Sequence, residues 1–258
     1  MIRVVQIVGF QRSGTNWLTW LLKEHCRNAI FLVYAKHWTP LQHEIRILEG
    51  GQPETHLDEL FYTLTKKHKP TIPPLVLHTN AIDIPMTDRE PYAPVESLPI
   101  IERAIKARQV RYAMIVKHPV AAIRSRTRGF KNYRNKPMQV RIDSWVKFHK
   151  VWMEKSVLLG DRFCFVRHKA LLEDTEVQLK RICESLNLEV LPGPVTTTEN
   201  RIHLGAHEQK RKSFDADYYL NEDWWDDMDV QTARAIHDAV PHAVMDWYGY
   251  SWGRQGDY

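Results

Sequence analysis

One segment near the start of the chain constrains the fold more than any other. Residues 4–8 form an apolar, β-branched run of the kind found in buried strands. A short turn with Gly9 and Gly14 follows, and residues 16–26 then place apolar side chains at helical spacing. A strand that leads through such a turn into a helix aims the free N–H groups of the first helical turn at one point. The segment therefore predicts a phosphate-binding loop.

The rest of the chain alternates between strand and helix patterns. Further strands are expected at residues 30–34, 75–77, 111–117 and 163–167, and helices at residues 57–65, 100–107, 120–128, 140–158, 176–186 and 231–247. This alternation predicts an α/β fold with three layers, α/β/α, in which helices cover both faces of a central parallel sheet. Because the 258 residues show no internal repeat, we expect a single domain over residues 1–258.

Composition limits the classes of partner. A net charge of +5 without a long basic run suits an anionic nucleotide better than a nucleic acid. The three cysteines lie singly in apolar segments, which favours core thiols in a reducing compartment over a disulfide framework or a zinc site. We find no secretory signal pattern and no apolar run of the ~20 residues that a membrane span needs. We therefore expect a cytoplasmic protein with neither a nucleic-acid partner nor a membrane span.

The predicted loop differs from that of nucleoside triphosphate-binding proteins. Gly9 and Gly14 match the two glycines of G-x-x-x-x-G-K-[ST], but Thr15 and Asn16 stand where the lysine and the magnesium-binding hydroxyl belong. The sequence RSGTNWL, which starts at Arg12, instead resembles the [RK]-S-G-T-[TSN]-W-[LF] loop of sulfotransferases. That family holds the 5′-phosphosulfate of 3′-phosphoadenosine 5′-phosphosulfate (PAPS) in this loop and requires no metal. The resemblance implies a P-loop-like sulfotransferase fold and a donor-binding set of Gln11, Arg12, Ser13, Gly14, Thr15, Asn16 and Trp17.

A second segment resembles the same family. The strand expected at residues 111–117 delivers Lys117, a proline can then open a helix, and Ser125 follows eight positions after Lys117. Sulfotransferases have the pattern R-[DN]-P-x-x-x-x-x-S, whose Arg and Ser bind the 3′-phosphate of PAPS. Here Lys117 replaces the Arg and His118 replaces the Asp or Asn, so the charge is kept but the bidentate guanidinium is lost. The resemblance implies that Lys117 and Ser125 bind the 3′-phosphate.

Two later segments resemble the family more weakly. Arg211 and Lys212 match the first two residues of the R-K-G loop that closes over the 3′-phosphate, and Ser213 stands in place of the glycine. The resemblance implies that Arg211 and Lys212 bind the donor. Residues 165–188 resemble a strand and helix in which Y-E-D-L is replaced by residues 168–171, HKAL. This stretch is mostly structural in the family, so it supports the fold rather than a site.

The general base is expected shortly after the second strand. Lys36 and His37 loosely resemble the K-T-H-x-P element of cytosolic sulfotransferases, in which the His is the base. Transfer to a hydroxyl needs a base within hydrogen-bond reach of the proton, and imidazole titrates in the useful range. We expect His37 to be the catalytic base, with Lys36 and Arg12 stabilising the developing charge. His78 and Glu44 are the alternatives.

The resemblance implies an enzyme that moves the sulfuryl group of PAPS to a hydroxyl or amine acceptor and leaves 3′,5′-adenosine bisphosphate (PAP). Two alternatives are an ATP- and magnesium-dependent small-molecule kinase of the P-loop fold and a non-catalytic nucleotide-binding protein. The missing lysine at position 15, and the lack of an obvious acidic magnesium motif after a strand, disfavour the kinase. No motif distinguishes a glycan, a lipid or a small metabolite as the acceptor, and none indicates the oligomeric state.

Overall fold

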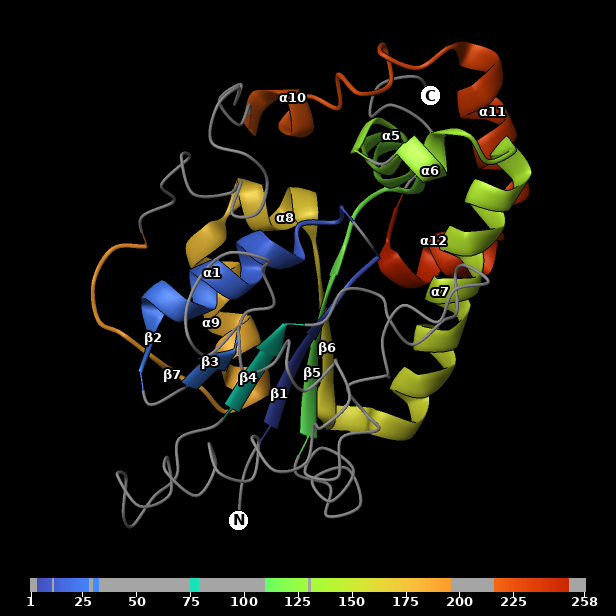
Figure 1. Ribbon diagram of the computed structural model, residues 1–258. Helices are drawn as coiled ribbons and strands as arrows, with labels where there is room; N and C mark the ends of the chain where they lie inside the picture. Colours follow the sequence, from blue (N-terminus) through green and yellow to red (C-terminus); the bar gives the residue numbers. More distant parts are fainter. Residues whose placement is uncertain are drawn as a thin grey trace.

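A parallel sheet of five strands forms the centre of the molecule (Figure 1). The structure is a computed structural model that describes residues 4–10, 12–27, 30–32, 75–78, 110–129, 131–195 and 216–250. The strand order is β3-β4-β1-β5-β6, and every neighbouring pair is parallel. The strands are β1 (Val4–Val8), β3 (Ile30–Leu32), β4 (Leu75–His78), β5 (Val110–Val116) and β6 (Phe163–Arg167).

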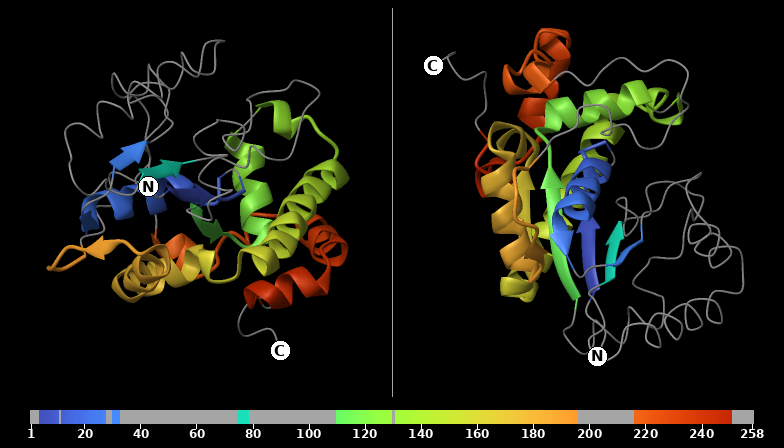
Figure 2. Two further views of the ribbon diagram at one scale, coloured as in Figure 1. Left: turned by 90° about the horizontal axis from the view of Figure 1, so that it is seen from below. Right: turned by 90° about the vertical axis from the view of Figure 1, so that its left-hand side faces the viewer.

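Helices cover both faces of this sheet (Figures 1 and 2). On one face lie α1 (Thr15–His25) and α9 (Thr175–Leu186), and on the other lie α7 (Met138–Leu159), α11 (Val230–Ala239) and α12 (His242–Tyr248). The remaining helical elements are α5 (Pro119–Gly129), α6 (Lys131–Arg134), η2 (Gly160–Arg162), α8 (His168–Glu173) and α10 (Ala216–Leu220). Within the described ranges, no helix is long and apolar enough to cross a membrane.

The alternation of side chains along the strands creates two apolar cores. In β5, Ala113 and Ile115 pack in the core shared with α1 and α9, whereas Tyr112 and Met114 pack in the core shared with α7 and α12. All four side chains are buried. Neighbouring residues of a strand point to opposite faces, so an almost wholly apolar strand must be covered on both sides. The three-layer α/β/α architecture predicted from the sequence is confirmed.

The carboxyl ends of the three middle strands meet at one edge of the sheet. Ile7 of β1 is paired with His78 of β4 on one side and with Ala113 of β5 on the other. From β1 the chain continues to the β3 and β4 side, and it then crosses back to β5 and β6. Such a reversal of strand order at the carboxyl edge is where open parallel sheets bind their ligands. The loop after β1 and Lys117 after β5 both lie at this edge.

The single helix predicted at residues 231–247 is wrong. The structure has two helices there, α11 and α12, with Pro241 between them as the N-cap of α12. Proline has no N–H for the helical ladder, and its ring collides with the preceding turn, so α11 ends before it. The apolar spacing continues through this break, and spacing alone therefore could not reveal it. The helices predicted at residues 57–65 and 100–107 lie outside the described residues.

A short antiparallel pair was not predicted at all. It joins β2 (Cys26–Arg27), directly after α1, to β7 (Glu189–Val190), after α9. Strands of two residues are too short to have a period, so the sequence carries no signal for them. The expectation that the cysteines are core thiols is confirmed, because Cys26, Cys164 and Cys183 are free and buried.

Candidate functional site

The loop between β1 and α1 has the backbone of an anion-binding turn. Arg12 and Gly14 both have positive φ, 73° and 102°, and Ser13 between them donates its N–H to the carbonyl oxygen of Phe10 at 2.9 Å. Gly14 is the N-cap of α1, and in the described part of the chain no side chain caps the first N–H groups of this helix. These donors, together with the positive end of the helix dipole, face an anion position. A non-glycine residue held in the left-handed region costs on the order of 1–3 kcal/mol, which is typical of functional loops.

Two glycines allow the loop to lie close to the sheet. A Cβ on Gly9 would lie 2.6 Å from Thr15 Cγ2 and 3.0 Å from the carbonyl oxygen of Ile115. A Cβ on Gly14 would lie 3.0 Å from His168 Cδ2, and the positive φ of Gly14 disfavours any side chain. The glycine spacing that predicted the loop therefore has a steric reason in the structure.

Side chains of the loop are buried around the anion position. Ser13 is fully buried, and its Oγ has no hydrogen-bond partner among the described residues. A buried hydroxyl left unpaired costs about 1–3 kcal/mol, a cost that a bound oxyanion would remove. Thr15 is buried as well, and Trp17 lies beneath the loop with its ring edge-to-face against His168, at 5.4 Å between ring centroids. The loop therefore presents donors from both its backbone and a side chain.

Lys117 follows β5 directly and is the second cation of the site. Its side chain is buried, and its Nζ lies 4.2 Å from the centroid of the Tyr219 ring. Among the described residues no carboxylate pairs with it. Burial, and after it the repulsion from the Arg12 guanidinium, lowers the pKa of Lys117 from 10.5 to about 7. A buried lysine next to a second cation, without a counter-ion, is typical of a site that binds an anion.

His118 stands where the related motif has Asp or Asn, and here its imidazole caps the start of α5. Its Nδ1 accepts a hydrogen bond from the Val120 N–H at 3.3 Å and so satisfies a free donor in the first turn of α5. The imidazole is packed among aromatic rings, with centroids 4.7 Å from Trp224, 5.2 Å from Trp225 and 5.3 Å from Tyr250. His118 therefore anchors the start of α5 without adding a negative charge beside Lys117.

Helix α5 forms one wall of the site. Arg12 is exposed and reaches toward the end of α5, where its Nε lies 3.3 Å from the position that a Cβ on Gly129 would take. Arg126 is buried, and its guanidinium lies over the ring of Phe10, 4.7 Å from the centroid, which fixes the first half of the loop. Ser125 lies on the same helix and is half-buried. The structure thus brings Arg12, Lys117 and the helix of Ser125 to one edge of the sheet.

Two residues of this edge were not predicted as site residues. His168 begins α8 directly after β6, is buried, and lies against Gly14 of the loop. Burial, and after it the charge of Lys117, holds its pKa well below 6.5. Tyr219 of α10 contacts both His168 and Lys117. Its ring centroid is 4.9 Å from that of His168, and Lys117 Nζ lies over its ring. The place of His168 at a strand end was a usable signal, whereas nothing in the sequence marks Tyr219.

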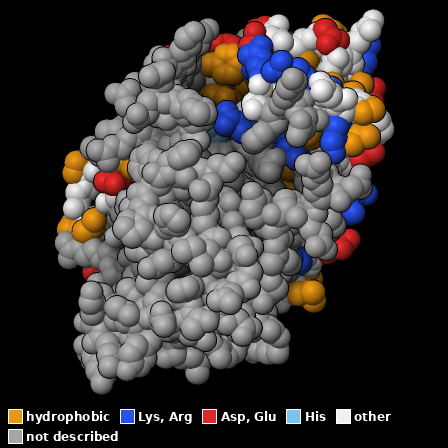
Figure 3. Space-filling model, viewed as in Figure 1, with side chains coloured by type: hydrophobic (Ala, Val, Ile, Leu, Met, Phe, Trp, Pro, Cys, Tyr) orange, Lys and Arg blue, Asp and Glu red, His pale blue; other side chains and the backbone are white. Residues whose placement is uncertain are grey.

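Basic side chains of the described residues gather at the upper end of the molecule in the space-filling view (Figure 3). This is the end at which β5 leads into α5 (Figure 1). Asn16 lies in the first turn of α1, and His78 ends β4. The other predicted site residues lie outside the described residues: Gln11, Lys36, His37, Glu44, Arg211 and Lys212.

The fold and this edge together describe a three-layer α/β/α protein with a candidate anion site at the carboxyl edge of its sheet. The chain belongs to the sulfotransferase family, because the model described as "Sulfotransferase family" matches residues 5–192. The matched range contains the loop after β1, Lys117, Ser125 and His168, and it ends before α10. No curated protein matches the chain. Family and fold support sulfotransfer as the general activity.

Solved structures of sulfotransferases share the fold. The sulfotransferase domain of the curacin biosynthetic pathway is 16% identical with a TM-score of 0.52, and the match covers 97% of this chain and 99% of that one. The sulfotransferase domain of the Synechococcus PCC 7002 olefin synthase is 14% identical with a TM-score of 0.55, covering 97% and 96%. Mouse sulfotransferase SULT7A1, crystallised with PAP, is 14% identical with a TM-score of 0.50, covering 92% and 82%. At such identities the similarity shows the fold alone.

Proposed function

We propose that the protein transfers the sulfuryl group of PAPS to a hydroxyl or amine of an acceptor and releases 3′,5′-adenosine bisphosphate (PAP). The observation that carries this proposal is a pair of cations at a turn with free N–H donors. Arg12 lies in the turn and Lys117 lies next to it, and no carboxylate among the described residues pairs with Lys117. The mouse relative crystallised with PAP supports the same ligand class.

The loop is proposed to hold the 5′-phosphosulfate. Its backbone N–H groups and the buried Ser13 hydroxyl would bind the phosphate oxygens, with Gln11, Thr15, Asn16 and Trp17 completing the set. Arg12 would lie beside the bond that breaks, where its guanidinium stabilises the charge that develops on the leaving phosphate. This arrangement stabilises charge with protein groups and needs no metal ion.

Lys117 and Ser125 are proposed to bind the 3′-phosphate, together with Arg211 and Lys212. An anion next to Lys117 would offset the repulsion from Arg12 and favour the protonated lysine. Binding of PAPS is therefore coupled to the uptake of a proton by Lys117.

Sulfuryl transfer is proposed to occur in line. The acceptor oxygen or nitrogen forms a new bond to sulfur while the bond from sulfur to the 5′-phosphate oxygen breaks. The acceptor proton passes to His37, assisted by Lys36, and the leaving electron pair stays on the phosphate next to Arg12. His78 is the alternative base because it ends β4, beside β1 at the carboxyl edge of the sheet.

Calorimetric titration with PAP, and separately with ATP plus magnesium, tests the donor site. We expect PAP to bind more tightly, and we expect Lys117→Ala and Arg12→Ala each to weaken PAP binding. Lys150→Ala, which removes an exposed lysine of α7, is the matched control and should bind as the wild type does. A preference for ATP with magnesium would favour the kinase alternative, and binding of neither ligand would refute the proposal.

A further inference from the structure

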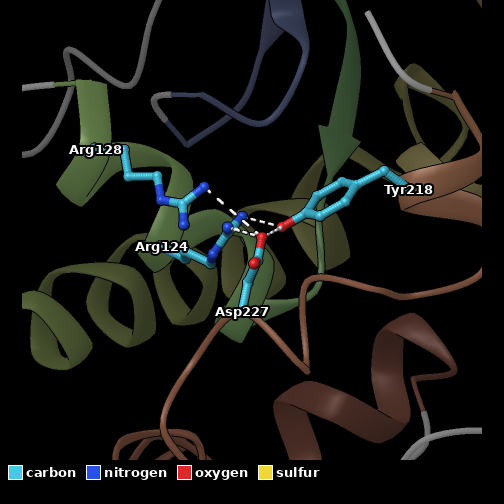
Figure 4. A network of polar contacts seen from close by, with 4 residues as sticks. All are labelled: Arg124, Arg128, Tyr218 and Asp227. Carbon is cyan, nitrogen blue, oxygen red and sulfur yellow. Dashed lines mark hydrogen bonds and ion pairs between the residues drawn. The ribbon is translucent and has the colours of Figure 1, made fainter.

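A network of polar contacts ties α5 to the segment after α10 (Figure 4). Oδ2 of Asp227 accepts from Arg124 Nη2 and from the Tyr218 hydroxyl, the latter at 2.8 Å, and it lies 3.8 Å from Arg128 Nη1. Arg124 also donates from Nη1 to the Tyr218 oxygen. Two hydrogen-bond donors, and the more distant guanidinium of Arg128, thus converge on a single carboxylate oxygen.

This network lies next to the cations of the proposed donor site. The ring centroids of Tyr218 and Tyr219 are 5.1 Å apart. The guanidinium carbon of Arg124 lies 5.2 Å from the Tyr218 centroid, and Lys117 Nζ lies 4.2 Å from the Tyr219 centroid. The two adjacent tyrosines of α10 therefore hold one cation each. Because Tyr219 also contacts His168 beside the loop, the network is continuous with the anion site.

Arg124 retains hydrogen-bonding capacity in this position. Its side chain is only 10% exposed, and its Nε is buried without a hydrogen-bond partner among the described residues. Burial, and after it the hydrogen bond to Asp227, raises the pKa of Tyr218, so this hydroxyl stays protonated and can donate. The group is a fork of guanidinium donors with a phenol donor beside it, which suits a phosphate-sized oxyanion.

We propose that Arg124 is a further residue that binds PAPS and supplies the bidentate guanidinium that is missing at position 117. We propose that the Asp227 carboxylate competes with the 3′-phosphate of PAPS for Arg124. The inference rests on the proposed function. In the free protein the Asp227 carboxylate neutralises Arg124. When PAPS binds, its 3′-phosphate replaces Asp227 as the acceptor for Arg124 and Tyr218, and the half-exposed Asp227 side chain turns to solvent.

The two partners of this ion pair distinguish the proposal from a purely structural role. If the pair only braces α5 against the segment after α10, loss of either partner loosens the same contact, and both variants lose affinity for PAP. If Arg124 binds the phosphate and Asp227 competes with it, removal of the carboxylate frees the guanidinium. The two substitutions then change the affinity for PAP in opposite directions.

The experiment compares PAP with adenosine 5′-monophosphate, which lacks the 3′-phosphate, by calorimetry at constant ionic strength. We expect Arg124→Gln to weaken PAP binding about tenfold to a hundredfold and Arg124→Lys to weaken it less. We expect Asp227→Asn to tighten PAP binding by a factor of about three to ten. Neither change should alter the affinity for the monophosphate more than about twofold. Arg128→Gln is the control, because this exposed arginine approaches the same oxygen only at 3.8 Å and should have little effect.

Each outcome bears on one claim. Weaker PAP binding in both Arg124→Gln and Asp227→Asn, or an equal loss for both nucleotides, would overturn the inference and leave the proposed function intact. Failure of the wild type to bind PAP would overturn the proposed function and the inference with it. Circular dichroism and the urea midpoint establish that each variant is folded, and Arg124→Lys retains the charge if Arg124→Gln does not fold.

Discussion

Replacement of Lys117 by Met should stabilise the free protein. The lysine is buried, no carboxylate among the described residues pairs with it, and Arg12 repels it. Methionine has a similar length, fills the same space and carries no charge, so it avoids the cost of burying an ammonium group. The same substitution should weaken the binding of PAP, because the site loses a cation. We therefore expect stability and ligand binding to change in opposite directions.

The magnitude follows from the pKa of Lys117. Burial, followed by repulsion from Arg12, lowers it from 10.5 to about 7, which corresponds to about 5 kcal/mol between the two charge states. Between pH 7 and pH 10.5 the unfolded chain binds a proton that the folded protein does not. In that window the free energy of unfolding of the wild type rises by about 1.4 kcal/mol per pH unit. Below pH 7 Lys117 is protonated in both the folded and the unfolded protein, and the folded protein bears the full free-energy cost of the buried charge.

The assay is urea unfolding followed by tryptophan fluorescence, under reducing conditions, at pH 7 and at pH 9. The advantage of Lys117→Met over the wild type should shrink by about 2–3 kcal/mol between these two pH values. Taking the difference between the two proteins removes the contribution of every group that titrates alike in both. Lys150→Met is the control, because this lysine is exposed on α7 and no burial cost is removed.

A constant difference between Lys117→Met and the wild type at both pH values would refute the reasoning. It would mean that Lys117 is not a buried cation in the free protein, and that an anion or water compensates it. A difference that grows with pH would contradict the sign of the argument.

Three further predictions concern the loop and the chemistry. Gly9→Ala should lower the free energy of unfolding by about 1–3 kcal/mol in the same urea assay, since its Cβ would lie 2.6 Å from Thr15 Cγ2. In wild-type calorimetry the affinity for PAP should fall by up to about tenfold per pH unit above pH 7, whereas Lys117→Arg should show no such dependence because a guanidinium stays charged. In steady-state kinetics His37→Ala should lower kcat by about 10²–10⁴-fold without changing the Kd for PAP, and His78→Ala should leave kcat intact. The reverse result would assign the base to His78.

The fold could be predicted where the pattern is local and long. The runs at residues 4–8 and 163–167 each match a strand to the residue, because apolar residues between turn signals have few other solutions. The long helix predicted at residues 140–158 is found as α7. Prediction failed at residues 231–247, because a proline ends the helix although the helical spacing of apolar residues continues past it. It also failed at β2 and β7, which pair only because the packed helices bring them together.

The candidate site shows the same division between local and distant information. The loop residues from Arg12 to Gly14 are consecutive, so one stretch of sequence carries the turn, the cation and the helix start. His168 and Tyr219 lie far along the chain from that loop, and only the packing of α8 and α10 against the sheet edge brings them to it. Arg124 has no sequence signal, because an arginine next to Ser125 on a helix looks like a surface residue.

The departures at positions 117 and 118 act together. The related motif pairs an Arg with an Asp or Asn, and the structure shows what position 118 must do: accept a hydrogen bond from the first turn of α5, as His118 does from the Val120 N–H. A carboxylate at this place would cap the helix equally well but would also lie next to the residue at 117. Beside an arginine, whose charge is permanent, such a carboxylate changes little. Beside a buried lysine, a carboxylate would raise the pKa of that lysine and would compete with an anionic ligand for its ammonium group. A capping imidazole packed among aromatic rings keeps α5 in place and leaves Lys117 without a carboxylate neighbour at position 118, so that an anionic ligand can supply the compensating charge.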